Sequence, residues 1–181
     1  MKALSVRQPW ACALVSHLAG SPIGDKRVEN RTWRINYRGD LLIVSSAKMA
    51  EDAAYASDRI ERHTGVRPPL DDPYMARGCI LGIVKVMACL DLATYERVRS
   101  YSIDHDVVFA TVAGAVDRGS MSVNHLSRTA SPWATGPYCW CVENVRRLPP
   151  TQAQGRLGLY NLDTVHGIPV DEWVKREAVR V

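Results

Sequence analysis

The stretch from residue 79 to residue 90, CILGIVKVMACL, restricts the possible folds of this chain more than any other part of the sequence. It is almost continuously apolar and rich in β-branched side chains, which is typical of a central strand in a sheet. Residues 40–45 form a second short apolar run after Gly39 and predict another buried strand. The sequence therefore predicts a sheet whose buried strands are covered by other elements.

Helices are predicted at three places. Residues 10–18 follow Pro9, which suits the first turn of a helix, and they stop before Gly20. Residues 49–63 combine alanines with interspersed charges and are closed by a glycine. Residues 170–179 form an amphipathic segment that predicts a terminal helix.

Further strands are expected near the C-terminus. Residues 136–145 alternate like a strand and are expected to stop at the prolines within 148–150, and residues 157–160 predict a brief closing strand. Residues 107–112 resemble a strand, but they lie in a stretch, 94–131, whose Ser, Gly, Asn and Arg content predicts an irregular insertion. Strands with flanking helices and no regular βαβ alternation indicate an α+β fold or a small barrel.

The composition is that of a globular protein. The chain has 181 residues, 46% of them hydrophobic and 23% charged, and a net charge of +4. This length suits one domain with a sizeable core. The five cysteines fit reduced thiols better than a disulfide set. Neither a secretory leader nor an apolar run of membrane-spanning length is evident, so we expect a cytoplasmic protein that does not enter membranes.

Three polar motifs within the first 39 residues carry most of the recognisable chemistry. Residues 5–11 read SVRQPWA, residues 29–33 read ENRTW, and residues 37–39 read YRG. Together they hold three arginines, two amides, a carboxylate and two tryptophans. Aromatic faces stack bases, amides and carboxylates read base edges, and arginines hold phosphates. The motifs therefore favour a nucleobase that carries a phosphate as the ligand.

These motifs resemble the ASCH domain family of the PUA-like superfamily. The resemblance extends to Trp133 and to residues 136–140, GPYCW, in the same order along the chain. It implies a small β-barrel flanked by α-helices, which would occupy residues 1–162 and include the insertion at 94–131. Residues 163–181 would then form a C-terminal helical extension.

The resemblance implies a protein that binds RNA, another nucleic acid or a modified nucleotide. We expect the ligand in a cleft lined by residues 7–10, 26–38 and 45–48. The side chains expected to contact it are Arg7, Gln8, Trp10, Lys26, Glu29, Asn30, Arg31, Trp33, Tyr37, Arg38, Ser45, Ser46, Lys48 and Tyr138.

Structural roles are the alternative for several of these side chains. Glu29 could be ion-paired with Arg31 or Lys26, and Gln8 could make a hydrogen bond at the start of the first helix. The tryptophans could close the core instead of stacking a base.

Catalysis is the alternative function. Lys26, Glu29 and Lys48 are the candidate catalytic residues of a metal-independent ribonuclease or of an amidohydrolase acting on an acylated cytidine. In the amidohydrolase branch of the superfamily a threonine stands at the position of Glu29. Related ASCH sequences often have a histidine at the position of Ser45. Both departures favour recognition over catalysis.

No metal or cofactor is expected. Cys139 and Cys141 point to one face of a strand, but the sequence supplies no convincing further ligands for zinc. The oligomeric state stays open.

Overall fold

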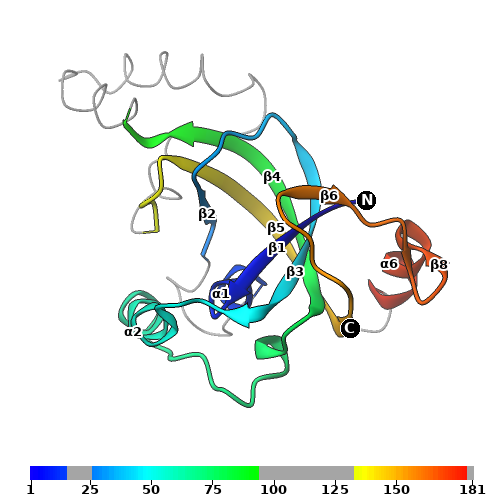
Figure 1. The fold of residues 1–181 in the computed structure, drawn as a ribbon, viewed down its shortest axis with the longest axis horizontal. Coiled ribbons are helices and arrows are strands. Elements are labelled where there is room, and N and C mark those ends of the chain that lie inside the picture. The colour runs from blue at the N-terminus through cyan, green and yellow to red at the C-terminus, as the bar shows by residue number, and fades with distance from the viewer. Residues whose placement is uncertain (16–25, 94–132, 179–181) are drawn as a thin grey trace. The chain divides into compact units, whose positions relative to one another are not determined.

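A computed structural model describes residues 1–15, 26–93 and 133–178 of the chain. Six strands form one mixed sheet (Figure 1): β1 (Lys2–Gln8), β2 (Val28–Arg31), β3 (Gly39–Met49), β4 (Cys79–Asp91), β5 (Tyr138–Gln152) and β6 (Leu159–Asn161). A hairpin pairs β7 (Thr164–Val165) with β8 (Ile168–Pro169). The helices are α1 (Trp10–Val15), α2 (Ala53–Thr64), the short 3-10 helix η1 (Pro73–Met75) and α6 (Val170–Ala178).

The strand order in the sheet is β2-β5-β4-β3-β1-β6. β1 runs parallel to β3 and antiparallel to β6, while β2 runs antiparallel to β5. The predicted α+β class is confirmed. Within the described residues no pairing between the end strands β2 and β6 closes the sheet, so the predicted barrel stays a prediction.

The chain divides into two compact units. The larger unit comprises Met1–Asp25, Asp40–Lys85 and Asn144–Val181, and the smaller unit comprises Lys26–Gly39 and Val86–Glu143. The long strands β4 and β5 each contribute residues to both units. All predicted site residues between positions 26 and 38 therefore belong to the smaller unit. Each unit is described by itself below.

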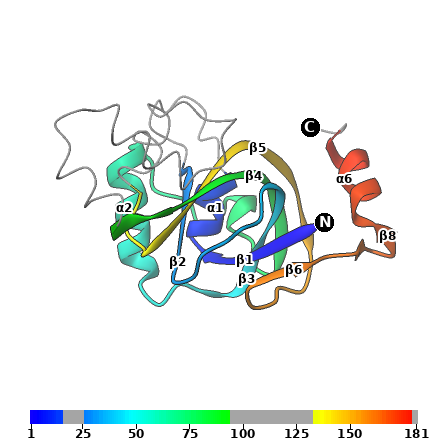
Figure 2. The ribbon, with the colours of Figure 1, turned by 90° about the horizontal axis from the view of Figure 1, so that it is seen from above.

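A buried apolar cluster in the larger unit joins the sheet to the C-terminal segment. It contains Val44 of β3, Ile80 of β4 and Tyr160 of β6, together with Trp173 of α6. Figures 1 and 2 both show α6 beside β8. The amphipathic pattern at 170–179 therefore predicted a helix that is present at Val170–Ala178, and its apolar face is buried in this cluster.

The predicted central strand is present as β4, which is buried at nearly every position. At Gly82 the backbone approaches its neighbours so closely that a Cβ would lie 2.6 Å from the carbonyl oxygen of Arg146. The same Cβ would lie 3.1 Å from Cγ1 of Val15 in α1. Only glycine fits this position without displacing backbone.

Other boundaries differ from those predicted. β3 continues to Met49, so residues 45–48 lie inside a strand and not at its end, and α2 begins only at Ala53. β5 continues past both prolines to Gln152. Proline is tolerated there because β2 pairs only with the first residues of β5, Tyr138 to Cys141. The part of β5 that contains the prolines therefore needs no amide donors toward β2.

Four strands, β1, β2, β7 and β8, were not predicted. The polar side chains of β1 and β2 were interpreted as ligand-binding motifs, and β7 and β8 lie within the predicted helical extension at 163–181. The predicted insertion at 94–131, including the strand at 107–112, lies outside the described residues. No helix in the described ranges has the length and apolar character needed to cross a membrane.

We expect Gly82→Ala to lower the free energy of unfolding by about 1–3 kcal/mol, because the new methyl group overpacks the contact with Arg146 and Val15. Urea-induced unfolding measures the change. Lys85→Ala, at an exposed position of the same strand, is the control and should change stability by less than about 0.5 kcal/mol. Equal stability of Gly82→Ala and the natural chain would contradict the close approach.

Candidate functional site

The strongest electrostatic feature of the smaller unit is a buried network around the carboxylate of Glu29. Lys26 Nζ lies 2.7 Å from Glu29 Oε2 and also donates to the carbonyl oxygen of Val28 at 2.7 Å. Arg31 Nη2 lies 3.1 Å from Glu29 Oε1. Glu29 and Arg31 are two residues apart on β2, so their side chains emerge on the same face of the strand. One carboxylate therefore binds two cations.

Burial is distributed unequally in this network. Lys26 is 3% exposed and Glu29 is 7% exposed, whereas the side chain of Arg31 is 24% exposed. Lys26 and Glu29 are thus paired inside the unit, and Arg31 is the most exposed of the three side chains. The ion pairs that the sequence allowed for Glu29 are both present.

Asn30, on the other face of β2, holds the segment that precedes β5. Its Nδ2 donates to the carbonyl oxygen of Trp133 at 2.9 Å. Its Oδ1 accepts hydrogen bonds from the backbone amides of Thr135 at 2.9 Å and Gly136 at 3.0 Å. The amide that was predicted to read a base edge is therefore engaged by its own chain.

Two tryptophans meet edge to face beside this network. The ring centroids of Trp33 and Trp140 are 4.5 Å apart with an interplanar angle of 82°. Trp140 is fully buried and donates from Nε1 to the carbonyl oxygen of Trp33 at 3.2 Å. Trp33 is only half-buried, so part of its ring remains accessible to a ligand. The guanidinium of Arg31 lies 6.0 Å from the Trp140 ring centroid.

Two further predicted residues of the smaller unit, Tyr37 and Arg38, lie at a turn that precedes β3. Arg38 Nη1 donates to the carbonyl oxygens of Ile35 at 3.3 Å and Tyr37 at 2.9 Å. Gly39 ends the turn with φ +119°, and a Cβ there would lie 3.2 Å from the hydroxyl of Tyr37. Arg38 thus stabilises the turn. Tyr138 is half-buried and lies opposite Arg31 in the β2–β5 register.

In the larger unit, Gln8 is completely buried and fixes local structure. Its Nε2 donates to the carbonyl oxygens of Tyr74 at 2.7 Å and Ala76 at 2.9 Å. Its Oε1 accepts from the backbone amide of Cys12 at 2.9 Å, which is the helix-start hydrogen bond allowed by the sequence.

The neighbours of Gln8 have exposed surface. Arg7 is exposed and pairs with Glu51 at 3.0 Å. Trp10 is half-buried, and the guanidinium of Arg59 lies 6.0 Å from its ring centroid.

The three predicted site residues of β3 differ in their exposure to solvent. Ser45 is buried, and its Oγ donates to the carbonyl oxygen of Cys79 at 3.1 Å and accepts from the amide of Cys79 at 3.0 Å. Ser46 is half-buried and Lys48 is exposed. Of these three side chains, Ser46 and Lys48 are accessible to a ligand.

Comparison with known proteins adds one decisive observation. The model of the ASCH domain matches residues 4–152, most of the chain. The chain belongs to the ASCH domain family. Over 97 residues it is 40% identical to activating signal cointegrator 1 of Homo sapiens and 35% identical to activating signal cointegrator 1 of Mus musculus. These alignments cover 51% of this chain and 15% of each relative, so the chain spans only a small part of those proteins.

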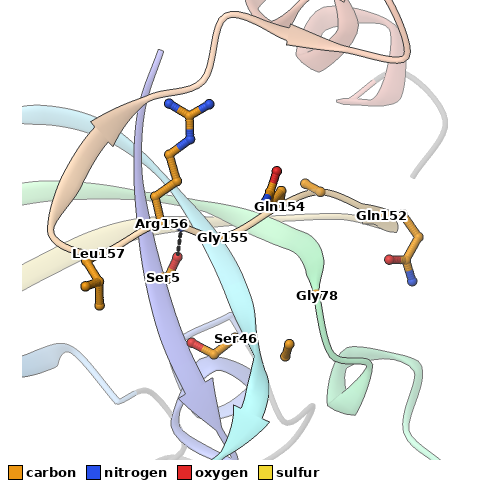
Figure 3. A pocket seen from close by; sticks show the side chains of 10 residues that line it. Ser5, Ser46, Gly78, Gln152, Gln154, Gly155, Arg156 and Leu157 are labelled. Carbon is orange, nitrogen blue, oxygen red and sulfur yellow. Dashed lines mark hydrogen bonds between the residues drawn. The ribbon is translucent and has the colours of Figure 1, made fainter.

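A groove of about 690 Å³ in the larger unit lies at the boundary of the ASCH match (Figure 3). It is lined by Ser5, Ser46, Ala47, Gly78 and residues 152–157. Sequence analysis identified Ser46 but not residues 152–157, nearly all of which lie beyond the matched ASCH residues. The glycines at 155 and 158 are the sequence signal that could have indicated an irregular segment there.

The thiols of the ASCH domain lie in its interior. All five cysteines are buried and free. Burial, together with the nearby thiols of Cys139 and Cys89, raises the pKa of Cys141 to about 12. No group of three or more His, Cys, Asp or Glu side chains in the described parts of the chain is arranged to hold a metal ion.

We expect Lys26→Met to lower the free energy of unfolding by about 3–5 kcal/mol, because it leaves the buried Glu29 carboxylate with one cation in place of two. Urea-induced unfolding gives the value. Arg146→Met removes a half-exposed pair with Asp40 and should cost less than about 1 kcal/mol. Similar losses in both variants would show that the Lys26–Glu29 pair contributes no more than a surface pair.

A pH dependence follows from the buried thiol. The pKa of Cys141 is raised from 9.0 in a model thiol to about 12 in the folded chain. Between these values the unfolded chain loses a proton that the folded chain keeps, so this thiol's contribution to stability falls as pH rises. The stability difference between the natural chain and Cys141→Ala should therefore shrink above pH 9, by up to about 1.4 kcal/mol per pH unit. Urea unfolding at pH 8 and pH 10 measures it, and a constant difference would contradict the raised pKa.

Proposed function

We propose that this ASCH domain binds single-stranded RNA or a nucleotide through residues 26–38, which we call the basic segment. One observation carries the proposal. The basic segment holds five cationic side chains, Lys26, Arg27, Arg31, Arg34 and Arg38, and a single carboxylate. Its net charge of +4 equals that of the entire chain. Such a concentrated positive charge is the electrostatic signature of a surface that contacts phosphates.

The geometry of the network supports this function. The guanidinium of Arg31 pairs with Glu29 while its side chain is 24% exposed, so part of this cation is accessible to a ligand. Arg34 is exposed and Trp33 is half-buried. Guanidinium groups can bind phosphates in pairs of hydrogen bonds, and an accessible indole face can stack a base for about 1–3 kcal/mol. A phosphate contact from Arg31 or Arg34 and a base contact from Trp33 are thus available within residues 31–34.

Other predicted contacts are not equally supported. The intramolecular hydrogen bonds of Gln8, Asn30 and Ser45 favour structural roles, and we do not place them in contact with RNA. Contacts from the other residues of 7–10 and 45–48, and the closed PUA-like barrel implied by the family, stay predictions.

The burial of Lys26 and Glu29 favours binding over catalysis. A general base or acid must reach the proton that it moves, and these two side chains are bonded to each other at 2.7 Å and almost inaccessible. We therefore rank the ribonuclease and the nucleoside amidohydrolase below a binding module. Prolonged incubation with RNA should leave it intact, whereas cleavage that is abolished by Glu29→Gln would establish the enzyme instead.

Arg34→Ala should weaken binding to a labelled single-stranded RNA and reduce the salt dependence of binding. If Arg34 contacts one phosphate, the slope of log K against log[salt] becomes shallower by about 0.7. Fluorescence anisotropy over a series of salt concentrations measures both quantities. Arg62→Ala, which removes an exposed arginine of α2, is the matched control and should leave the slope unchanged. Identical slopes for all three proteins would exclude Arg34 from the interface, and undetectable binding by the natural chain would refute the function.

A further inference from the structure

A second groove in the larger unit lies between α2 and the segment that follows this helix. Its volume is about 460 Å³. Among the described residues eight line it, and all but Ser57 and Arg67 are apolar. The apolar members are Met49, Ala53, Ala54, Pro68, Pro69 and Leu70. It shares no described lining residue with the groove of Figure 3 or with the basic segment, so it is a separate feature of the molecule.

The wall opposite α2 is held in place by a turn and by ion pairs. The chain reverses after α2 at Gly65, which has φ +74°. Arg67 then returns to the helix, where its Nη1 lies 2.6 Å from Asp58 Oδ1 and 3.0 Å from Glu61 Oε2. The two prolines that follow Arg67 have fixed φ angles. This wall is therefore stiff and tied to α2.

The start of the other wall is fixed by β1. The pairing of β3 with β1 skips residues 46–48, which form a bulge in β3, and resumes where Met49 pairs with Gln8. The backbone amide of Ala50 donates to the carbonyl oxygen of Gln8 at 2.8 Å, shortly before α2 begins. The entry of the chain into α2 is therefore anchored to the sheet, and the groove is preformed.

Large apolar side chains are exposed around this groove. Among the described residues the large hydrophobic side chains that are exposed are those of Tyr55, Val66, Leu70 and Leu157. The first three belong to α2 or to the six residues after it. Leu70 lines the groove and is 86% exposed. A local concentration of exposed apolar side chains is typical of a surface that binds another molecule.

The same region is acidic although the chain as a whole is basic. Residues 51–72 contain six carboxylates and three arginines, so their net charge is −3, against +4 for the entire chain. Arg67, which lines the groove, is paired with two of these carboxylates. Arg7 of β1, which pairs with Glu51, and Lys48 of β3 reduce the negative excess but do not reverse it. The apolar groove is therefore bordered by negative charge.

This charge decides which kind of molecule fits the groove. Carboxylates repel a nucleic acid, and a second copy of the chain would bring the same acidic surface into the contact. A protein segment with lysine or arginine beside apolar side chains matches both the charge and the lining. The small side chains of Ala53, Ala54 and Ser57 leave room for a second helix to approach α2 closely. An amphipathic helix presents its apolar side chains on one face, as such a groove requires.

We propose that this groove binds an amphipathic helix of a partner protein whose polar face is basic. The apolar side chains of that helix enter between α2 and residues 67–70. Its basic side chains lie against the half-exposed carboxylates of Asp58 and Glu61. All described lining residues belong to the larger unit, whereas the basic segment belongs to the smaller unit. The site therefore goes beyond the proposed function and does not depend on it.

Three synthetic peptides test the proposal. The first is a helical peptide of leucine, lysine and alanine with its leucines on one face. The second has glutamate in place of lysine, and the third has the composition of the first with its leucines spread around the helix. Isothermal titration calorimetry with the full chain should give a Kd of about 1 mM or tighter for the first peptide and binding at least about tenfold weaker for the others. No binding of the first peptide, or equal binding of either other peptide, would overturn the proposal.

Two pairs of matched substitutions assign the binding to this groove. Leu70→Ser removes an exposed apolar side chain from the wall and should weaken binding of the first peptide about fivefold or more. Leu157→Ser removes the fully exposed leucine near β6, which Figures 1 and 2 both show apart from α2, and should have no effect.

The second pair adds a cation. Ala54→Arg places a long, positively charged side chain in the groove and should abolish binding. Ala47→Arg makes the same change at another exposed alanine and should retain binding. Because all four substituted positions are exposed, the fold should be unaffected in each variant. Binding that survives both Leu70→Ser and Ala54→Arg would place the peptide elsewhere and contradict the proposal.

Other occupants of the groove give distinct results. Sedimentation equilibrium of the chain alone detects a second copy, and self-association that is lost in Leu70→Ser would assign the groove to the chain itself. RNA binding that is weakened by Leu70→Ser would assign the groove to nucleic acid. Either result would overturn the proposal. We expect neither, and because RNA binding and peptide binding are measured separately, this proposal and the proposed function can fail independently.

Discussion

The burial of β4 is the constraint on which the rest of the fold depends. A strand with apolar side chains at nearly every position is stable only where other elements remove those side chains from water. α1 approaches it at Gly82 through Val15, and the C-terminal residues Tyr160 and Trp173 complete the cluster that includes Ile80. The C-terminal helix is thus part of the hydrophobic core of the larger unit.

The smaller unit shows how a motif rich in charged residues can have a structural role. Glu29 binds Lys26 inside the unit and Arg31 at its surface. A buried carboxylate with two cationic partners fixes the position of the more exposed guanidinium, which reduces the conformational entropy that Arg31 would lose on binding a phosphate. The same burial leaves Lys26 and Glu29 almost inaccessible to a ligand. Recognition follows more naturally from this arrangement than turnover does.

Sequence patterns predicted the elements whose stability comes from apolar burial. The α+β class, β4, α2 and α6 could be recognised because the spacing of apolar residues and the frequency of β-branched residues indicate burial directly. β1 and β2 could not, since their polar residues satisfy partners far away in the chain: Gln8 bonds to carbonyls 66 and 68 residues later. The ion pairs of Glu29 were among the predicted alternatives because they are local. The groove walls were missed because residues 46–48 and 152–157 come together only through strand pairing.

The bulge in β3 separates pairing with the neighbouring strand from the exposure of side chains to solvent. A regular strand combines both roles in the same residues. On either side of the bulge the pairs of Val6 with Ser45 and of Gln8 with Met49 maintain the sheet. The intervening residues, 46–48, do not determine that register, so they can vary in size, charge or number at little cost to stability. Across an evolving family, such a segment lets ligand preference diverge while the architecture stays the same.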